Sequence, residues 1–137
     1  MQTLKALALL AVLGAVVVPV AAGADLSVRA TIPFEFIVGD SVLPAGTYQF
    51  EPQNYGHLLA IWNADQRWRT LVMVQPAYRA ERGSAAASVV FNRYGARYFL
   101  SEVWGVPDAG GKRVLKSRAE REASLKASAQ TVLVAAR

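Results

Sequence analysis

Three glutamates could supply the paired carboxylates on which glycoside hydrolysis depends. Glu35, Glu51 and Glu102 each fall in a stretch where apolar and polar residues alternate, so we expect each of them on a β-strand. A sheet can bring two such carboxyl groups to a separation of roughly 5–10 Å, at which one acts as acid and the other as base or nucleophile. Alternation by itself also places polar residues on the solvent side of a strand. A small carboxylate-dependent hydrolase acting on carbohydrate is therefore the alternative, and a non-catalytic protein is the favoured interpretation.

Other residue types that carry catalysis or bind metals are scarce. His57 is the only histidine, the chain has no cysteine, and no serine stands in a Gly-x-Ser-x-Gly turn. Zinc sites need three or four ligands, mostly nitrogen or sulfur, and Asp40, Asp65 and Asp108 are too far apart in the sequence for a calcium loop. No glycine-rich phosphate loop or dinucleotide fingerprint occurs. We therefore predict no catalytic, metal-binding or cofactor-binding residues.

Aromatic and cationic residues are interleaved and suggest a binding face. Rings exposed on a sheet stack against sugars, and neighbouring arginines attract anions. The same combination would suit single-stranded nucleic acid, but export makes nucleic acid an unexpected partner. Packing into the core is the commoner fate of a tryptophan within a strand. The candidate residues of this face are Trp62, Trp68, Trp104, Arg67 and Arg69.

The formal net charge of +5 is concentrated in the C-terminal segment. Residues 25–111 carry seven arginines against eight acidic residues, whereas residues 112–137 carry seven basic residues against Glu120 and Glu122. Such a tail could attach to an anionic surface or to a polyanionic envelope polysaccharide, with a strength that salt reduces. A solvated helix is the simpler interpretation of this charge run. The candidate contacts are Lys112, Arg113, Lys116, Arg118, Arg121 and Lys126.

The first 24 residues have the three parts of a secretory signal peptide. A lysine lies near the start, Ala6–Val18 is an unbroken apolar run of 13 residues, and Ala22 and Ala24 are the small residues expected before a cleavage site. We expect cleavage within about two or three positions of Ala24. A retained membrane anchor is the alternative, but the apolar run is short for a bilayer core of about 30 Å. The mature protein is therefore expected in the periplasm or outside the cell, with no transmembrane span after cleavage.

About 113 residues remain after cleavage, which is enough for one domain. The absence of cysteine excludes lipoprotein anchoring, disulfides and thiolate chemistry. We divide the chain into a signal peptide at residues 1–24, an antiparallel β-domain at residues 25–111 and a basic tail at residues 112–137.

Strand and turn signals alternate through the predicted β-domain. In Phe34–Glu51 apolar positions recur on either side of turns at Gly39–Asp40 and Pro44–Gly46, and we expect Gly46 to use its freedom to take a positive φ. Leu58–Trp62 and Leu71–Val74 are apolar on both faces, which indicates strands covered on both sides.

Two further hairpins are predicted from turn residues. We place their tips at residues 63–66 and 92–95, with Gly95 in the left-handed conformation. Together the signals predict a mainly β fold, either a single antiparallel β-sandwich or a partly closed barrel.

The C-terminal segment changes from strand to helix signals. Ser117 and Glu120 fit a capping box at the start of a short helix that extends to about Gln130. Thr131–Val134 then has the β-branched composition of a strand. We expect this possible final strand to return to an edge of the sheet or to pair with another chain.

Four stretches carry a family resemblance. They are Ile32–Phe36 with Val38–Gly39, Leu43–Tyr48, Phe91–Gly95 and Lys116–Glu122. Together they resemble a family of short, uncharacterised exported proteins of acidobacterial-type soil bacteria. The resemblance covers most of the mature chain and implies an exported β-rich domain, with no catalytic or binding residues to carry over.

These observations lead to one expected function and two alternatives. We expect an exported, non-catalytic β-domain that acts as a binding, structural or assembly module of the periplasm or cell surface. Its expected partner is an envelope polysaccharide, an anionic surface or another protein chain. The alternatives are the carboxylate-dependent hydrolase and attachment to a polyanion through the basic tail.

Overall fold

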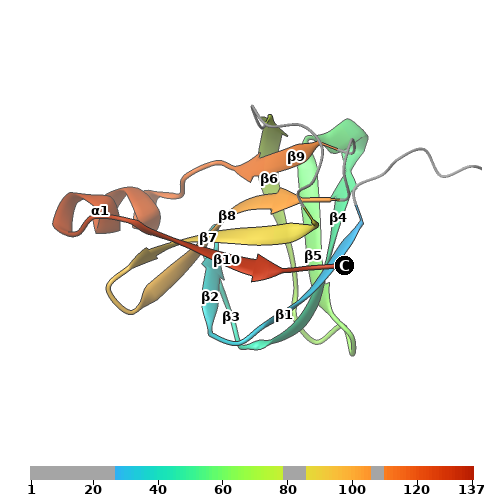
Figure 1. Ribbon diagram of the computed structural model, residues 1–137, viewed down its shortest axis with the longest axis horizontal. Helices are drawn as coiled ribbons and strands as arrows, with labels where there is room; N and C mark the ends of the chain where they lie inside the picture. The colour runs from blue at the N-terminus through green and yellow to red at the C-terminus, as the bar shows by residue number, and fades with distance from the viewer. Residues whose placement is uncertain (1–26, 79–85, 106–109) are drawn as a thin grey trace, which may run out of the picture.

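The computed structural model describes residues 27–78, 86–105 and 110–137 of the chain, and Figure 1 shows how its elements are arranged. The predicted signal peptide and its cleavage site lie outside these residues. Among the described elements, no helix has the length and apolar character needed to cross a bilayer.

Within these ranges the chain forms ten strands, one 3-10 turn and one α-helix. The alternation seen in the sequence drives the strands: in β1 every second side chain is buried, as the period of two requires. The bounds are β1 Val28–Ile32, β2 Phe36–Val38, β3 Ser41–Leu43, β4 Gly46–Gln53, η1 Asn54–Gly56, β5 Leu58–Asn63, β6 Arg69–Ala77, β7 Ser88–Tyr94, β8 Arg97–Trp104, β9 Gly111–Val114, α1 Arg118–Lys126 and β10 Gln130–Ala135.

The strands form one mixed sheet that curls around the core without closing (Figure 1). Its main path is β1-β4-β5-β6-β9-β8-β2-β3, while β7 pairs with β8 and β10 pairs with β7. The expectation of a mainly β fold with a short C-terminal helix is confirmed. Among the described strands every pair is antiparallel except β2 and β8, which pair in parallel at Ile37 and Phe99. The β2–β3 hairpin lies beside β8 at the end that β9 does not reach.

Aromatic rings fill the interior of the curled sheet. The ring of Phe36 meets that of Tyr48 at 5.1 Å and that of Phe91 at 5.4 Å, and Phe34 meets Phe91 at 5.0 Å, all edge to face. Such contacts are attractive because the positive edge of one ring faces the negative face of the other. The largest fully buried side chains are Tyr48, Phe36, Phe50, Phe91, Phe99, Ile32, Leu43, Leu59, Ile61, Leu100, Val28 and Val38. The interior is therefore occupied by side chains.

The outer surface of the sheet is covered only in part. Val90 and Trp104 form a small second apolar cluster with Ala77, on the side of β7 and β8 opposite the main core. On β6, in contrast, Leu71 is 54% exposed and Met73 is 62% exposed. The expectation that this strand is covered on both faces is wrong, because its outward positions have no layer packed over them among the described residues.

The corner at Phe34–Glu51 follows the predicted turns, with one change. Gly39 takes a φ of +58° between β2 and β3, where a side chain would be strained. Gly46 does not take a positive φ, so the expectation for it is wrong. The second turn is instead held by Tyr48, whose hydroxyl donates to the carbonyl oxygen of Pro44 at 2.7 Å. This bond satisfies the hydroxyl of a buried ring while fixing the turn.

Both predicted hairpins are present. The β5–β6 tip is held by Asn63, whose side-chain Oδ1 accepts from the backbone N–H of Trp68 at 3.1 Å. The second tip is shorter than expected, because β7 continues to Tyr94 and only Gly95 and Ala96 connect it to β8. Gly95 has a φ of +61°, which confirms the left-handed conformation predicted for it.

The segment predicted as a tail contributes two strands to the sheet, one beside β8 and the other beside β7. β9 lies between β6 and β8, and β10 pairs with β7 along its whole length. Between them, the hydroxyl of Ser117 caps helix α1 by accepting from the N–H of Glu120 at 3.1 Å. The reciprocal half of the capping box is not formed, because the Glu120 carboxylate turns toward β7.

A close approach between β8 and β9 makes Gly111 sensitive to substitution. A Cβ at Gly111 would lie 2.5 Å from Cε3 of Trp104. We expect Gly111→Ala to lower the free energy of unfolding by about 2 kcal/mol, because the ring must shift within a packed cluster. Urea denaturation checks this. Gly46→Ala is the matched control: its Cβ would meet Tyr48 at an ordinary 3.6 Å, so stability should stay within about 1 kcal/mol of the wild type. Equal losses in both variants would contradict the steric explanation.

Candidate functional site

The structure separates the three tryptophans proposed for a binding face. Trp104 is only 6% exposed, and its Nε1–H donates to Oε2 of Glu102 at 2.7 Å. It therefore packs against the second apolar cluster. Trp62 is half-buried on the outer side of β5, and Trp68 is 45% exposed just before β6. Trp62 and Trp68 remain available at the surface.

Trp62 belongs to a row of polar and cationic side chains that crosses four strands. The strand register places Arg29 of β1 opposite Gln49 of β4, Gln49 opposite Trp62 of β5, and Trp62 opposite Arg69 of β6. Residues directly opposite each other in antiparallel strands point to the same side of the sheet. Their neighbours Val28, Ala30, Tyr48, Phe50 and Ile61 are buried, so the row faces outward. With strands about 4.8 Å apart, it spans roughly 14 Å. We call these four residues the outer row.

The C-terminal residue extends the outer row at one end. Arg137 and Arg29 exchange two backbone hydrogen bonds, of 3.0 and 2.9 Å, so they form an opposed pair. Both side chains are exposed. The outer row therefore begins with two adjacent arginines, whose like charges favour an anion between or above them.

The other end of the outer row combines an aromatic face with a cation. The guanidinium carbon of Arg69 lies 5.7 Å from the centre of the Trp62 ring, within the range of a cation–π contact. Arg67 lies nearby in the hairpin but its guanidinium faces Asp65 at 3.6 Å. Both side chains of that ion pair are well exposed, so it contributes little to stability.

A small hollow lies along the outer row. Its volume is about 220 Å³. Beside it the hydroxyls of Thr31 and Thr47 are hydrogen-bonded at 2.9 Å. The hollow is lined by Arg29, Thr47, Tyr48, Gln49, Trp62, Asn63 and Ala64. Amide, hydroxyl, guanidinium and indole groups are the ones that bind sugars bearing acidic groups, through hydrogen bonds, charge and stacking.

Negative charge borders this surface on one side. Glu51 stands two residues beyond Gln49 on β4, opposite Ala60 of β5, and therefore on the same outer face. It is half-buried. A carboxylate at this position weakens the attraction of the row for an anion.

The three candidate carboxylates do not come together. β4 and β8 are separated in the sheet by β5, β6 and β9, so Glu51 and Glu102 lie four strands apart, roughly 19 Å along the curled sheet. Glu35 precedes β2, which runs parallel to β8 with Ile37 opposite Phe99. Glu35 is therefore level with Arg97, and Glu102 lies five residues, or about 16 Å, further along β8. Glu102 is also held by Trp104 and by Arg113, at 3.3 Å. Glu102 therefore does not come within the separation that glycoside hydrolysis needs of either Glu35 or Glu51.

The basic residues of the C-terminal segment are dispersed. Arg113 pairs with Glu102, and Arg118 pairs with Glu122 at 3.1 Å, instead of the Glu122–Lys126 pair that the spacing also allows. Lys112 extends over Gly56, where a Cβ would lie 2.6 Å from its Nζ.

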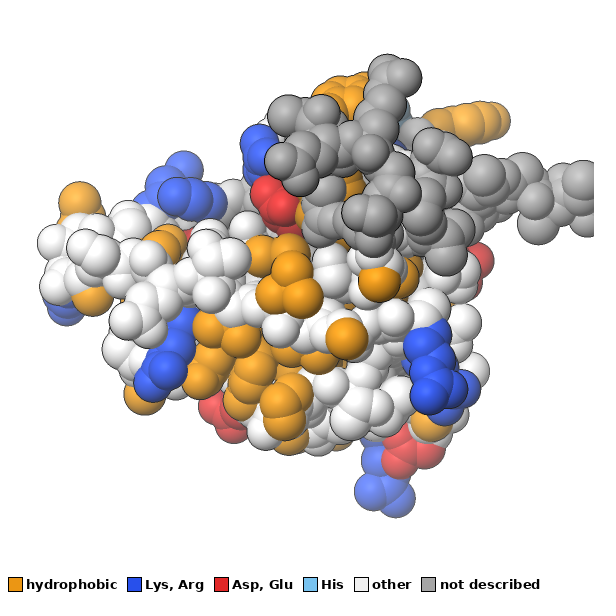
Figure 2. Space-filling model, in the orientation of Figure 1, with side chains coloured by type: hydrophobic (Ala, Val, Ile, Leu, Met, Phe, Trp, Pro, Cys, Tyr) orange, Lys and Arg blue, Asp and Glu red, His pale blue; other side chains and the backbone are white. Residues whose placement is uncertain are grey.

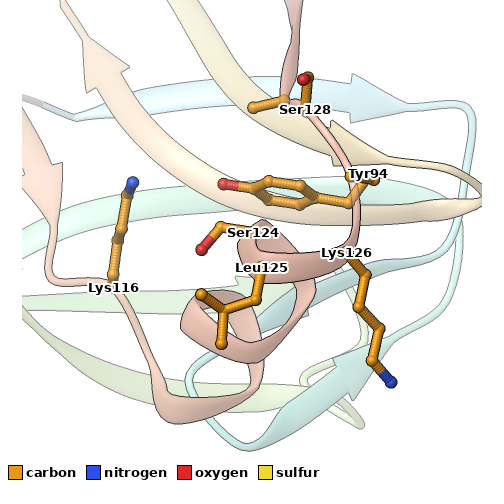
Figure 3. Close-up of a pocket in the computed structure, with 8 residues that line it drawn as sticks. Tyr94, Lys116, Ser124, Leu125, Lys126 and Ser128 are labelled. Carbon is orange, nitrogen blue, oxygen red and sulfur yellow. The ribbon is translucent and has the colours of Figure 1, made fainter.

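Lys116 and Lys126 border an open hollow at the end of α1, beside Tyr94. Figure 3 shows their side chains pointing away from each other on opposite sides of it. Arg121 is exposed on the helix. The six residues therefore do not converge on one patch.

A buried glutamate attaches α1 to the sheet. Glu120 is 3% exposed, and its Oε1 accepts from Nδ2 of Asn92 at 3.0 Å and from the hydroxyl of Tyr94 at 3.3 Å. Both donors lie on β7. Burial raises the pKa of Tyr94, and the Glu120 carboxylate raises it further. The sequence pattern identified Glu120 only as a capping residue, and the register of β7 was needed to reveal this second contact.

Loss of this contact should cost far more than loss of a surface charge. We expect Glu120→Ala to lower the free energy of unfolding by about 2–3 kcal/mol, because it leaves the amide of Asn92 and the hydroxyl of Tyr94 without their acceptor. Glu122→Ala, on the exposed side of the same helix, should cost less than about 0.5 kcal/mol. Thermal or urea denaturation compares the two. Similar losses would show that helix propensity, and not the buried contact, is responsible.

The raised pKa of Tyr94 predicts a loss of stability in alkali. A folded-state pKa above the unfolded value of 10.0 means that the unfolded chain releases this proton first. The contribution of the protonated Tyr94 to the free energy of unfolding is therefore fully present below pH 10 and is lost as the pH rises through the folded-state pKa. In Tyr94→Phe, the fall in unfolding free energy between about pH 9 and pH 11 should be shallower. An unchanged slope would contradict the assignment.

Among the described residues, no cluster of three or more histidine, cysteine or acidic side chains could hold a metal ion. Comparison of the chain with models of protein families, with curated proteins and with solved structures found no match.

Proposed function

We propose that this chain is an exported, non-catalytic binding module whose outer row binds acidic carbohydrate. The observation that supports the proposal is the register that aligns Arg29, Gln49, Trp62 and Arg69 across four neighbouring strands. A flat ring offers a stacking platform for a pyranose, and arginines on either side bind its carboxylates or sulfates. The predicted signal peptide is consistent with a polysaccharide of the cell envelope as the partner.

The rigidity of the surface favours binding without rearrangement. Three of the four residues of the outer row stand beside a residue packed into the core: Arg29 beside Val28, Gln49 beside Tyr48, and Trp62 beside Ile61. Side chains held on paired strands lose less conformational entropy on binding than side chains on a free loop. The binding surface is therefore largely formed before a ligand arrives.

The outer row supports this function better than the basic tail does. Arg113 and Arg118 already face carboxylates, and Lys116 and Lys126 point apart. At the end of the outer row, Arg29 and the adjacent Arg137 have no acidic partner at ion-pair distance among the described residues. Attachment through the tail is therefore the competing explanation, and the binding experiment must distinguish it from binding at the outer row.

Substitutions in the outer row should weaken binding to an acidic glycan. With polygalacturonate as the probe and isothermal titration calorimetry as the measurement, we expect Trp62→Ala and Arg29→Gln each to raise Kd about tenfold, through loss of stacking and of a charged hydrogen bond. Glu51→Gln should lower Kd a few-fold, because it removes the carboxylate beside the row. All affinities should fall as salt is raised.

Arg121→Gln is the matched control, because it also removes one exposed arginine but lies on α1. Its Kd should equal that of the wild type. If Arg121→Gln weakens binding as much as Arg29→Gln does, the glycan binds through the tail or through net charge alone, and not through the outer row. Equal affinity for polygalacturonate and neutral dextran would refute the requirement for acidic groups.

A further inference from the structure

The sheet is open along one seam, between β10 and β1. The two strands meet at the C-terminus, where Arg137 and Arg29 exchange backbone hydrogen bonds, and diverge away from it (Figure 1). No ladder joins them among the described residues. Continuing the register of the Arg29–Arg137 pair would place Thr31 opposite Ala135. The seam therefore begins next to this pair and widens toward the start of β10.

The backbone on both sides of the seam is set to pair with another strand. The N–H of Ala136 donates to Ala87 on the β7 side, while Arg137 bonds to β1. Successive residues of a strand direct their N–H and C=O groups to opposite sides. The backbone N–H and C=O groups of Thr131, Leu133 and Ala135 therefore face the seam. By the same alternation Thr31 faces it from β1. Within the described ranges, these four residues have no backbone hydrogen bond across the seam.

Apolar side chains lie along the same opening. Val132 and Val134 are only partly buried against the core, and so is Phe34, in the link between β1 and β2. The ring of Phe34 stacks on Tyr98 at 3.8 Å and meets Phe91, which is opposite Val132 in the β7–β10 pair. Figure 2 shows apolar side chains gathered on this face, over the region where β10 and β1 diverge. Leu133 is 61% exposed on β10 itself.

The narrow end of the seam is positively charged. Arg29 and Arg137 are both exposed there. At the wide end, Arg93 is paired with Gln130 in the ladder and lies over the Tyr98 ring at 5.4 Å. A strand that enters the seam with an acidic residue at the narrow end would thus meet complementary charge.

We propose that this seam binds an extended segment of another polypeptide by strand addition. Unpaired N–H and C=O groups along an edge are satisfied by the backbone of an incoming strand, and alternate apolar side chains of that strand would cover Val132, Val134 and Phe34. The segment has alternating apolar and polar residues, with an acidic residue beside Arg29 and Arg137. The seam lies along β10, and its binding does not depend on Trp62 or on the proposed carbohydrate function.

A synthetic peptide tests the proposal. The probe is the capped hexapeptide Asp-Val-Thr-Val-Thr-Val, in which the period of two puts Asp on the outward side with Arg29 and Arg137 and the valines on the inward side with Val132 and Val134. The same peptide with Lys in place of Asp is its charge control. On titration of the full mature chain, amide NMR signals of Thr131, Leu133 and Ala135 should shift, and their hydrogen exchange should slow. The Lys peptide should bind about tenfold more weakly, because it faces two arginines.

Two variants separate the backbone contribution from the side-chain contribution. Leu133→Pro removes an N–H that faces the seam and not β7, so the β7–β10 ladder is kept and the peptide should bind about tenfold more weakly. Leu133→Ala keeps that N–H and should bind within about twofold of the wild type. Circular dichroism and the β7 amide signals verify that Leu133→Pro is folded.

Four outcomes would overturn the proposal. They are shifts confined to β3 or to the outer row, equal binding by Leu133→Pro and wild type, equal binding of the Asp and Lys peptides, and no binding at millimolar peptide. Sedimentation without peptide covers a further case. If the wild type forms dimers that Leu133→Pro dissociates, the seam is occupied by a second copy of this chain, and the proposal of a different partner fails.

Discussion

The edge-to-face contacts of Phe36 with Tyr48 and Phe91 are the interaction on which the rest of the structure depends. They join β2 to β4 and to β7, which are not neighbours in the sheet, and so hold the curled sheet together across its interior. Since hydrogen bonds connect only adjacent strands, the curvature would not persist without such contacts. Every strand that contributes a ring to the interior must also present its alternate residues outward. The outer row is a consequence of that constraint.

The same interior contacts explain why the sheet stays open. The β2–β3 hairpin is placed by Phe36 beside β8, and Phe34 carries the preceding link under Phe91. β1 must reach this link from its position beside β4, so it runs away from β10 after Arg29. β10 in turn is held along β7 by six residue pairs. β1 and β10 are thus fixed to different partners and diverge. Their facing backbone N–H and C=O groups therefore do not pair with each other.

Local features of the sequence predicted the fold better than they predicted the surface. The turn at Gly39, the hairpin tip at Gly95 and the cap at Ser117 each depend on residues within a few positions, and each is present. Trp104 and Glu120 could not be assigned, because their burial depends on β9 and β7, which are distant or later in the chain. Alternation shows that a residue points outward, but it does not show which strands are neighbours.

The outer row illustrates that limit most clearly. Arg29, Gln49, Trp62 and Arg69 come from four strands and share no sequence motif. The arginines beside Trp68 drew attention to one end of the row, whereas Arg29 and Gln49 carried no signal of their own. Their alignment follows only from the register of three successive ladders. A one-residue shift in any ladder would turn one of these side chains into the core.

Folding also changes where the positive charge of the chain is effective. Along the sequence the excess lies in residues 112–137, but Arg113 and Arg118 face carboxylates once the chain is folded. Arg137 is carried by β10 to the edge of β1, where it adds to Arg29. The charge that a linear count assigns to a tail is thus partly compensated and partly transferred to the face of the sheet. Because unpaired charges at short separation dominate the local potential, the electrostatic surface of this protein is set by strand pairing more than by the position of charges in the sequence.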